Sequence, residues 1–349
     1  MSYYISYMDD ARKDVITYIT SEYTEKNLNF VRYMLLDVYN LWEEAKEILA
    51  QENINKRYNT RYIPKKSGKM RRVDEPDEQL KDFMRRVVDV FSNKTCLMFP
   101  QAAFAYIKGR STKQMAEVHK GHKDYVLKLD ISDFFTNCTL EFIMNAMSVV
   151  YPFCVMDTTV LEVIVKACML KYNGEYGLPQ GAPTSPLLSN IAMIPVDYEL
   201  QRKYKSYTRY ADDIYISFIS REKFISLAEL EVKDIIEKFN PKFCLNEDKT
   251  RLVKLKKASG VWITGIMLNK DDNITIGYKT KKKLKAIIWN FLMDAKNGKH
   301  WSKEKLHKML GNVGHWKYVE PQYVEKVIRQ YEQKTGMNYR KEIKNICSK

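Results

Sequence analysis

The sequence predicts an α+β fold, with a mixed centre of strands and helices between two helical ends. Apolar residues recur at three- and four-residue spacing through FVRYMLLDVYNLWEEAKEIL near the start, as in an amphipathic helix. Short β-rich runs separated by Gly, Pro and Asp turns fill the centre, and a lysine-rich helical pattern follows to the end. The 349 residues, 45% of them hydrophobic, suffice for two or three subdomains around a sizeable core.

The first part of the chain, residues 1–58, is predicted to be a helical extension. The stretch RYIPKKSGKMRRVDEP then predicts a hairpin, because Ser67-Gly68 lies between alternating, basic flanks. A further helix is predicted over EQLKDFMRRVVDVFSNK.

The centre begins with YVLKLDISDFF, which predicts a buried strand that runs into a turn, and a helical region is expected from there to about Tyr172. GLPQGAPTSPLLSN predicts a Gly/Pro loop and then a helix capped at Thr184 or Ser185. Pro186 would lie in its first turn, where the missing N–H costs nothing. The expected buried stripe of this helix is Leu187, Leu188, Ile191, Ile194 and Tyr198.

The remaining elements alternate in the same way. TRYADDIYISF predicts strand, turn and strand, and LAELEVKDIIEKF predicts an amphipathic helix. Further strands are predicted over FCLNEDKTRLVKL and GVWITGIMLN. From about Tyr278 the chain is predicted to be helical and basic.

The charge balance indicates a polyanionic partner. Lys and Arg number 58 against 43 Asp and Glu, a net charge of +15. The six cysteines are scattered without a C-x-x-C pair, so neither a zinc site nor a disulfide framework is predicted. Acids stand where a signal peptide would be apolar, and no stretch of eighteen apolar residues occurs, so we expect no membrane span and a cytoplasmic protein.

Three acids are the main candidates for chemistry. Asp130 ends an apolar strand, and Asp212-Asp213 lie at a hairpin tip. The pair could simply be a solvated turn. Alternatively, three carboxylates on neighbouring strands could bind two divalent cations roughly 3.5 to 4 Å apart, as in phosphoryl transfer, and hard oxygen ligands suit Mg²⁺.

Five ordered motifs carry a resemblance to a known family. LKLDISDFF, GLPQGAPTSPLLSN, YADD, LNEDKT and WITGIML resemble the successive motifs of reverse transcriptases, over about residues 60 to 275. The resemblance implies an RNA-directed DNA polymerase with a right-hand fold. Residues 59–275 would form the fingers and the palm, an antiparallel sheet packed on helices, and residues 276–349 a helical, basic thumb after the extension at 1–58.

Two short segments favour the bacterial retron type. Ile263-Thr264-Gly265 resembles the retron V-T-G signature, and MAEVH resembles N-A-x-x-H, with Met115 in place of the asparagine. Such enzymes imply a cognate structured noncoding RNA as template and primer. Synthesis from a 2′-OH would give a branched RNA–DNA hybrid (msDNA), and a separate effector protein would act with it in anti-phage defence. The alternatives are an intron-like, diversity-generating or untemplated phage-exclusion polymerase, or a non-catalytic RNA-binding scaffold.

The resemblance assigns a role to each candidate near the acids. Asp130, Asp212 and Asp213 would bind two Mg²⁺ ions, with a backbone carbonyl from Ile131. Lys249 in LNEDKT would protonate the leaving pyrophosphate, although it could also be a surface lysine at a strand edge.

Further residues would contact the deoxynucleoside triphosphate. Phe135 would be a steric gate against a ribose 2′-OH, although it could instead be core packing, as expected of Phe134. Gln180 would touch the sugar of the nucleotide. Arg71, with Lys66 or Lys65, would bind the triphosphate, because an arginine fork binds phosphate in a bidentate manner. Gly177 and Gly181 would allow close approach of the backbone.

The end of the chain would hold nucleic acid. WITGIML would be the primer grip, and YKTKKKLK would follow the phosphate backbone of a duplex, unless its lysines are only a solvated face. The aromatic and histidine cluster after it is predicted to form thumb core and caps, or to recognise an RNA stem-loop: Trp301, His307, His315 and Trp316.

Overall fold

The computed structural model describes residues 25–51, 53–64, 68, 70–93, 97–121, 124–219, 222–255 and 260–347. Residues 1–24 of the predicted extension, and the candidates Lys65 and Lys66, lie outside this set. The chain divides into two compact units. The first takes the residues up to Arg110 together with 127–216 and 221–252, and the second takes 111–126, 217–220 and 253–349.

The first unit begins with helix α2, as the sequence predicts. This helix, Glu25–Ala50, buries apolar residues at three- and four-residue spacing, and it packs on α7 (Thr158–Ala167) and α3 (Glu78–Asn93). The buried residues are Val38, Leu41, Ala45 and Ile48. The predicted hairpin follows as the antiparallel strands β1 (Tyr58–Pro64) and β2 (Met70–Pro76), with Gly68 at a positive φ of 82° between them.

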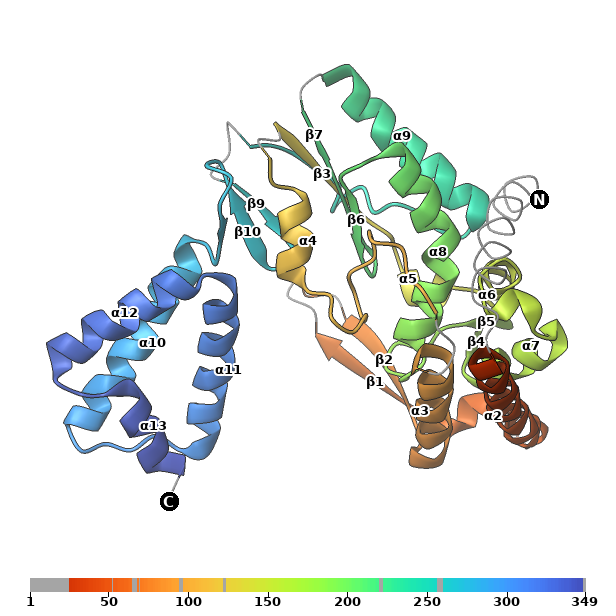
Figure 1. Ribbon diagram of the computed structural model, residues 1–349, viewed down its shortest axis with the longest axis horizontal. Coiled ribbons are helices and arrows are strands. Elements are labelled where there is room, and N and C mark those ends of the chain that lie inside the picture. Colours follow the sequence, from red (N-terminus) through yellow and green to blue (C-terminus); the bar gives the residue numbers. More distant parts are fainter. Residues whose placement is uncertain are drawn as a thin grey trace. The chain divides into compact units, whose positions relative to one another are not determined.

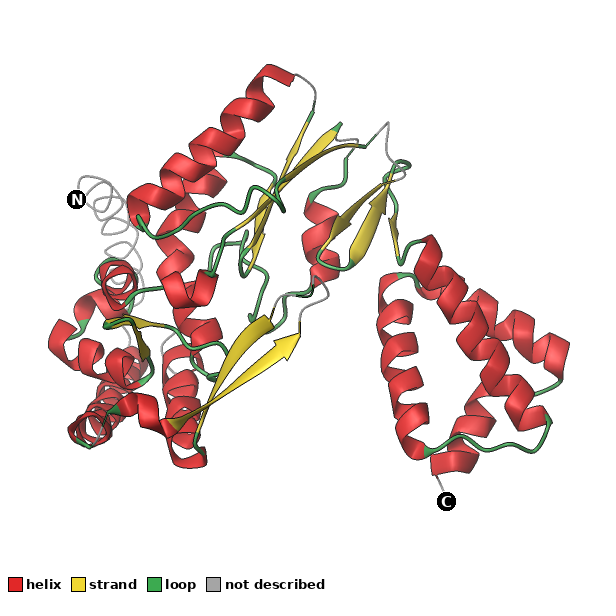
Figure 2. Ribbon diagram, turned by 180° about the vertical axis from the view of Figure 1, so that it is seen from behind, coloured by secondary structure: helices red, strands yellow, loops and turns green. Residues whose placement is uncertain are grey.

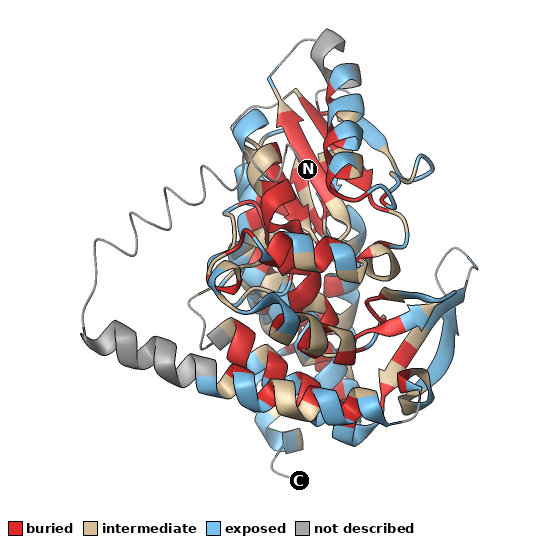
Figure 3. Ribbon diagram, turned by 90° about the vertical axis from the view of Figure 1, so that its right-hand side faces the viewer, coloured by how far each residue is buried: buried red, intermediate tan, exposed pale blue. Residues whose placement is uncertain are grey.

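A four-stranded sheet carries the centre of this unit, in the order β6-β7-β3-β8 (Figure 1). Its strands are β3 (Tyr125–Asp130), β6 (Tyr207–Tyr210), β7 (Asp213–Phe218) and β8 (Arg251–Lys254). Helices α8 (Ser185–Lys203) and α9 (Glu222–Phe239) lie along one side of it in Figures 1 and 2. Red, buried segments concentrate in these strands and in α8 in Figure 3, so the core lies between sheet and helices.

Three local predictions need correction. The strand expected over FCLNEDKTRLVKL covers only Arg251–Lys254, because the carbonyl of Asn246 accepts hydrogen bonds from Lys249 and Thr250 and forms a turn. The helical region does not reach Tyr172. It ends with α7, and Asn173-Gly174, both at positive φ, then close a hairpin of β4 (Leu170–Tyr172) and β5 (Glu175–Gly177).

The third correction concerns the burial of helix α8. It begins where predicted, after Thr184, but it is buried on nearly all sides rather than along one stripe, and Tyr198 is only half-buried. The reason is its position, since it contacts α6, α9 and strand β6. The other elements of the first unit are η1 (Ile54–Arg57), α5 (Phe134–Asn137), α6 (Leu140–Met147) and η2 (Phe153–Val155).

The second unit combines a small sheet with helices. Its sheet has the order β11-β10-β9, with β9 (Gly260–Ile263), β10 (Ile266–Asn269) and β11 (Ile274–Thr275), and α4 (Thr112–Val118) packs against it. The part after Tyr278 is helical, as predicted, and consists of α10 (Tyr278–Lys296), α11 (Lys303–Val319), α12 (Pro321–Thr335) and α13 (Tyr339–Cys347). Among the helices that the structure describes, none combines the length and the apolar character that a membrane crossing requires.

Candidate active site

The Asp212-Asp213 pair lies at a tight turn between β6 and β7. Tyr210 pairs with Asp213, so Ala211 and Asp212 alone form the loop. Ala211 is buried and has a φ of 55°, a left-handed conformation that residues other than glycine seldom adopt. Strain of this kind persists only where the surroundings fix it, and here Nη1 of Arg209 donates a hydrogen bond to the Ala211 carbonyl at 3.1 Å.

Arg209 belongs to a buried polar network beneath the turn. Its Nε and Nη2 donate to the two carboxylate oxygens of Asp197 at 2.7 Å each, and the Tyr207 hydroxyl donates to the same carboxylate at 2.6 Å. Both charged side chains are fully buried. Burial by itself would lower the pKa of Arg209, but the Asp197 carboxylate raises it, so the guanidinium stays charged.

Asp130 meets this turn from the neighbouring strand. The N–H of Ile131 donates to the carbonyl of Asp212 at 3.0 Å, and Asp130 is 4% exposed at the end of β3. Burial, followed by the charges of Asp213 and Asp130, raises the pKa of Asp212. The fold therefore brings the three predicted carboxylates close together at one end of the sheet.

Two lysines neutralise these acids. Lys249 Nζ lies 2.8 and 2.9 Å from the two carboxylate oxygens of Asp130, so the predicted palm lysine is beside the acids. Lys128 Nζ lies 2.9 Å from Asp213, a contact that was not predicted. Burial opposes the charge of Lys128, yet the hydrogen bond with Asp213 leaves its pKa raised. The position of Lys128 near the acids could have been predicted from the sequence. Residues two apart on a strand share one face, and Lys128 precedes Asp130 by two.

The donor set fits a divalent cation by its chemistry. Carboxylate oxygens are hard ligands, and a cation would offset the repulsion between the acids, which adds to burial in raising the pKa of Asp212. In the described part of the chain no three Asp, Glu, His or Cys side chains converge as a preformed metal site. Lys249 pairs with Asp130 and Lys128 pairs with Asp213. The β-bridge between Ile131 and Leu245 is formed through the carbonyl of Asp130 and the N–H of Ser132. The carbonyl of Ile131, predicted to be a metal ligand, takes no part in this bridge.

The candidate nucleotide residues lie on two connected segments of the first unit. Phe134 is buried and stacks on Phe243, as expected of core packing, whereas Phe135 is half-buried. The carbonyl of Phe135 accepts a hydrogen bond from Leu178, and the carbonyl of Gln180 accepts one from Asp74 of β2. The loop that carries Gln180 is therefore tied both to the segment after Asp130 and to the β1–β2 hairpin.

The two glycines of this loop allow the predicted close approach. A Cβ on Gly177 would lie 2.3 Å from the carbonyl oxygen of Thr136, and one on Gly181 would lie 2.9 Å from that of Asp74. On β2, Arg71 is exposed, whereas Arg72 is held by the Asp74 carboxylate at 2.9 Å. Arg72 is exposed as well, so the two arginines differ in that the Asp74 carboxylate holds Arg72.

The second unit brings the two predicted signature segments together. Met115 of α4 is fully buried, and its sulfur lies 3.7 Å from the hydroxyl oxygen of Thr264. Thr264 and Gly265, both at positive φ, form the two-residue turn between β9 and β10. His119 is also fully buried, with Nδ1 3.1 Å from Ser217. Trp262 on β9 is 47% exposed, and its ring lies against Gly277.

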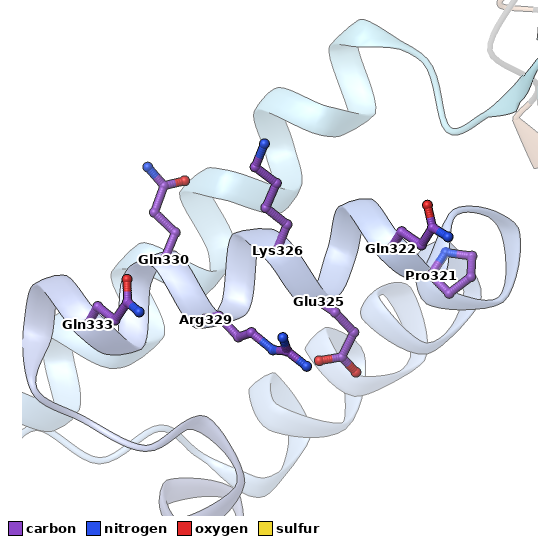
Figure 4. Close-up of a pocket in the computed structure, with 7 residues that line it drawn as sticks. All are labelled: Pro321, Gln322, Glu325, Lys326, Arg329, Gln330 and Gln333. Atoms are coloured by element: carbon purple, nitrogen blue, oxygen red, sulfur yellow. The ribbon is translucent and has the colours of Figure 1, made fainter.

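The C-terminal aromatic and histidine cluster divides between core and surface. Trp301 packs edge-on against Phe291 and donates a hydrogen bond to the carboxylate of Asp294 at 2.8 Å, so it serves helix packing. His307 and His315 are exposed on α11, and Trp316 is half-buried. A cavity follows one face of α12, where Figure 4 shows polar and charged side chains projecting from the helix. It is lined by Pro321, Gln322, Glu325, Lys326, Arg329, Gln330 and Gln333, so it contains none of the predicted catalytic residues.

Comparison with known proteins agrees with this arrangement. Residues 63–311 match the family model for reverse transcriptase (RNA-dependent DNA polymerase). Over 304 residues the chain is 27% identical to the retron Ec83 reverse transcriptase of Escherichia coli, covering 84% of this chain and 93% of that protein. Over 318 residues it is 28% identical to the retron Ec73 reverse transcriptase of the same organism, covering 86% and 95%.

Among solved structures, the telomerase of Candida tropicalis with a fragment of telomeric RNA aligns over 79% of this chain and 55% of that chain, with 12% identity and a TM-score of 0.48.

The family match contains the three carboxylates, Lys249 and the Gln180 loop. A basic hairpin, a sheet backed by helices and a helical C-terminal part are the elements expected of a right-hand polymerase fold. The chain therefore belongs to the reverse transcriptase (RNA-dependent DNA polymerase) family, and the relatives to which it is similar over most of its length are of the bacterial retron type.

Proposed function

We propose that this RNA-directed DNA polymerase copies a cognate structured noncoding RNA, which is both template and primer, and leaves a branched RNA–DNA hybrid (msDNA). Similarity to retron enzymes over most of the chain supports this. The main observation in its favour is the contact between Met115 and Thr264, which are 149 residues apart. This contact brings the two retron-like segments, on α4 and on the β9–β10 turn, against each other. Methionine in place of the usual asparagine fills this buried site with a soft sulfur contact.

At the catalytic end of the palm, Asp130, Asp212 and Asp213 would hold two Mg²⁺ ions. When bound, the ions would lower the pKa of the attacking hydroxyl and neutralise the triphosphate. Lys249 is 56% exposed while it touches Asp130, so its ammonium group lies at the border between the carboxylates and solvent. From there it could donate a proton to departing pyrophosphate, a role that contributes on the order of 10²- to 10⁴-fold in such reactions.

The nucleotide would lie between palm and fingers hairpin. Arg71 would bind the triphosphate, with Lys66 as its predicted companion, and Gln180 would touch the sugar. Phe135, half-buried rather than fully packed, has a ring surface left to exclude a 2′-OH. The hydrogen bond from Asp74 to the carbonyl of Gln180 keeps the loop and the hairpin in register.

The thumb helices would bind the RNA and its DNA product. Five lysines lie in the first turns of α10, and neutralising phosphates with them would make binding strongly salt-dependent. Lys326, Arg329 and three glutamines on the α12 face add donors that suit phosphate and ribose oxygens. By likeness to retron systems, a separate effector protein would act with the hybrid in anti-phage defence, in the cytoplasm where its RNA is made.

Substitution of one carboxylate tests the catalytic assignment. Asp212→Asn should abolish deoxynucleotide incorporation on a primed RNA template while the protein still co-purifies with its RNA. Lys233→Gln, at an exposed pair with Glu237 on α9, is the matched control and should retain full activity. Substantial primer extension by Asp212→Asn would contradict the assignment of the metal site.

A further inference from the structure

The loop between α3 and α4 presents an aromatic ring to the catalytic turn. Tyr106 in this loop is 54% exposed, and its ring centroid lies 6.2 Å from that of Tyr210, the residue that precedes the turn. Its φ of 60° places it in the left-handed region. A bulky residue is strained there, and such strain clusters at sites where ligands bind.

Two buried or partly buried side chains hold this loop from beneath. Nδ2 of Asn190, on α8, donates to the carbonyl of Ala105 at 2.7 Å, directly before Tyr106. Arg110 donates at 2.8 Å to the carbonyl of Phe99, and it also donates to the carbonyls of Pro100 and Ala103. Each of these bonds satisfies a backbone carbonyl of the loop, so the backbone that carries the ring is held in place.

Pairing with β6 fixes the loop along its side. The N–H of Arg209 donates to the carbonyl of Ala102 at 2.8 Å, and the N–H of Phe104 donates to the carbonyl of Arg209 at 2.9 Å. Arg209 also donates to the carbonyl of Ala211 in the catalytic turn. One buried arginine is therefore bonded to both the turn and the segment that leads to Tyr106.

The charges around Tyr106 show what it faces. Burial raises the pKa of its phenol, the carboxylate of Asp212 raises it further, and Arg71 acts in the opposite direction. Its hydroxyl group therefore lies within the field of both the candidate metal-binding acid and the candidate triphosphate-binding arginine. These are the two groups between which the incoming nucleotide would be bound.

We propose that Tyr106 is a further substrate-contacting residue, whose ring forms an aromatic surface against which a nucleobase of the nascent base pair stacks. The proposal rests on the assignment of Asp212 and Arg71 made above. Base–aromatic stacking is tolerant of sequence, as a templated polymerase requires, because every base presents a π-face. A ring held in a strained, fixed conformation loses little freedom when a base packs on it.

The test compares two substitutions at this position. Tyr106→Asn removes the ring, while asparagine tolerates the left-handed backbone, so the loop keeps its conformation. Tyr106→Phe keeps the ring and removes the hydroxyl group. Tyr39→Ala on α2, where the tyrosine is 51% exposed, is the control for loss of a surface aromatic residue.

Steady-state kinetics on a primed RNA template give the readout. Tyr106→Asn should weaken substrate binding by roughly 5- to 150-fold with little change in kcat, whereas Tyr106→Phe should stay within about twofold of the wild type. A raised KM for the deoxynucleotide assigns the stacking to the incoming base. A raised Kd for the template–primer, which disappears when the templating position is abasic, assigns it to the template base.

Three outcomes would overturn the proposal. Tyr106→Asn could bind both substrates as the wild type does, Tyr106→Phe could be as defective as Tyr106→Asn, or the loss could fall on kcat together with a lowered Tm. Asp212→Asn, assayed in parallel, separates this inference from the active-site assignment. If Asp212→Asn is inactive while Tyr106→Asn is unaffected, only the role of Tyr106 fails.

Discussion

The buried ion pair of Arg209 with Asp197, next to the Ala211-Asp212 turn, leads to a specific prediction about stability. Asp197→Asn keeps the shape of the side chain but leaves the cation of Arg209 uncompensated, with both side chains at 0% exposure. Removing one partner of a buried pair costs about 3 to 5 kcal/mol. The local unfolding equilibrium should therefore shift by roughly 10²- to 5 × 10³-fold.

Hydrogen–deuterium exchange resolves this effect by region. Peptides that cover β6 and β7 should lose protection, whereas those from α10 to α13 should not change, since the helices belong to the other unit. The control is Glu231→Gln, which breaks an exposed pair with Lys203 on the same helix as Asp197. Exposed pairs are worth only about 0 to 1 kcal/mol, so this variant should exchange as the wild type does.

A second substitution separates stability from positioning. Adding Arg209→Met to Asp197→Asn removes the uncompensated charge, so part of the protection should return. Catalysis should not return, because the bond from Arg209 to the carbonyl of Ala211 is also lost. A misplaced catalytic group can cost on the order of 10²-fold in rate. Wild-type exchange at β6 and β7 in Asp197→Asn would refute the reasoning, as would full activity of the double variant.

Three further predictions concern the titration of Asp212, the proposed steric gate at Phe135 and the contact of Gly277 with Trp262. Ionised Asp212 destabilises the fold, because its pKa is raised above the usual 3.8 by burial and by the neighbouring acids. Asp212→Asn should therefore stabilise the metal-free protein against urea at about pH 7 but not near pH 3, where both states are protonated, and equal stability at both pH values would contradict this. Phe135→Ala should raise the ribonucleotide incorporation measured in single-nucleotide extension, while unchanged sugar selectivity would exclude a gate. Gly277→Ala should cost at least about 1 kcal/mol more in urea unfolding than Gly298→Ala. Both glycines have positive φ, but only Gly277 lies against another side chain, that of Trp262, so equal losses would contradict this packing.

Local patterns predicted much of the fold correctly. The β6–β7 hairpin, helix α9 and the helical character of the chain after Tyr278 follow from periodicity and turn residues that act over short range. For helix α8, the start was predicted correctly but the pattern of burial was not. Its burial on nearly all sides depends on what packs around it, and no periodicity within the helix reports that.

Likewise, the sequence predicted only part of the candidate site, because some of its contacts depend on packing. Lys249 could be placed beside Asp130 from its motif, and the structure brings the two together. The pairing of Arg209 with Asp197 could not be predicted, because an arginine inside a β-rich run is normally taken to face solvent and its partner lies on a helix that precedes the strand. Long-range contacts of this kind depend on the packing of the sheet and become visible only in three dimensions.

The most direct test of the retron assignment is the nucleic acid that the protein makes. The chain is expressed with its native flanking DNA, and total nucleic acid is extracted and treated with RNase or with a debranching enzyme. We expect a short DNA whose mobility shifts on debranching. This DNA should be absent when Asp212→Asn replaces the wild type. A DNA product without a branch, or no product from the active wild-type protein, would contradict the retron assignment.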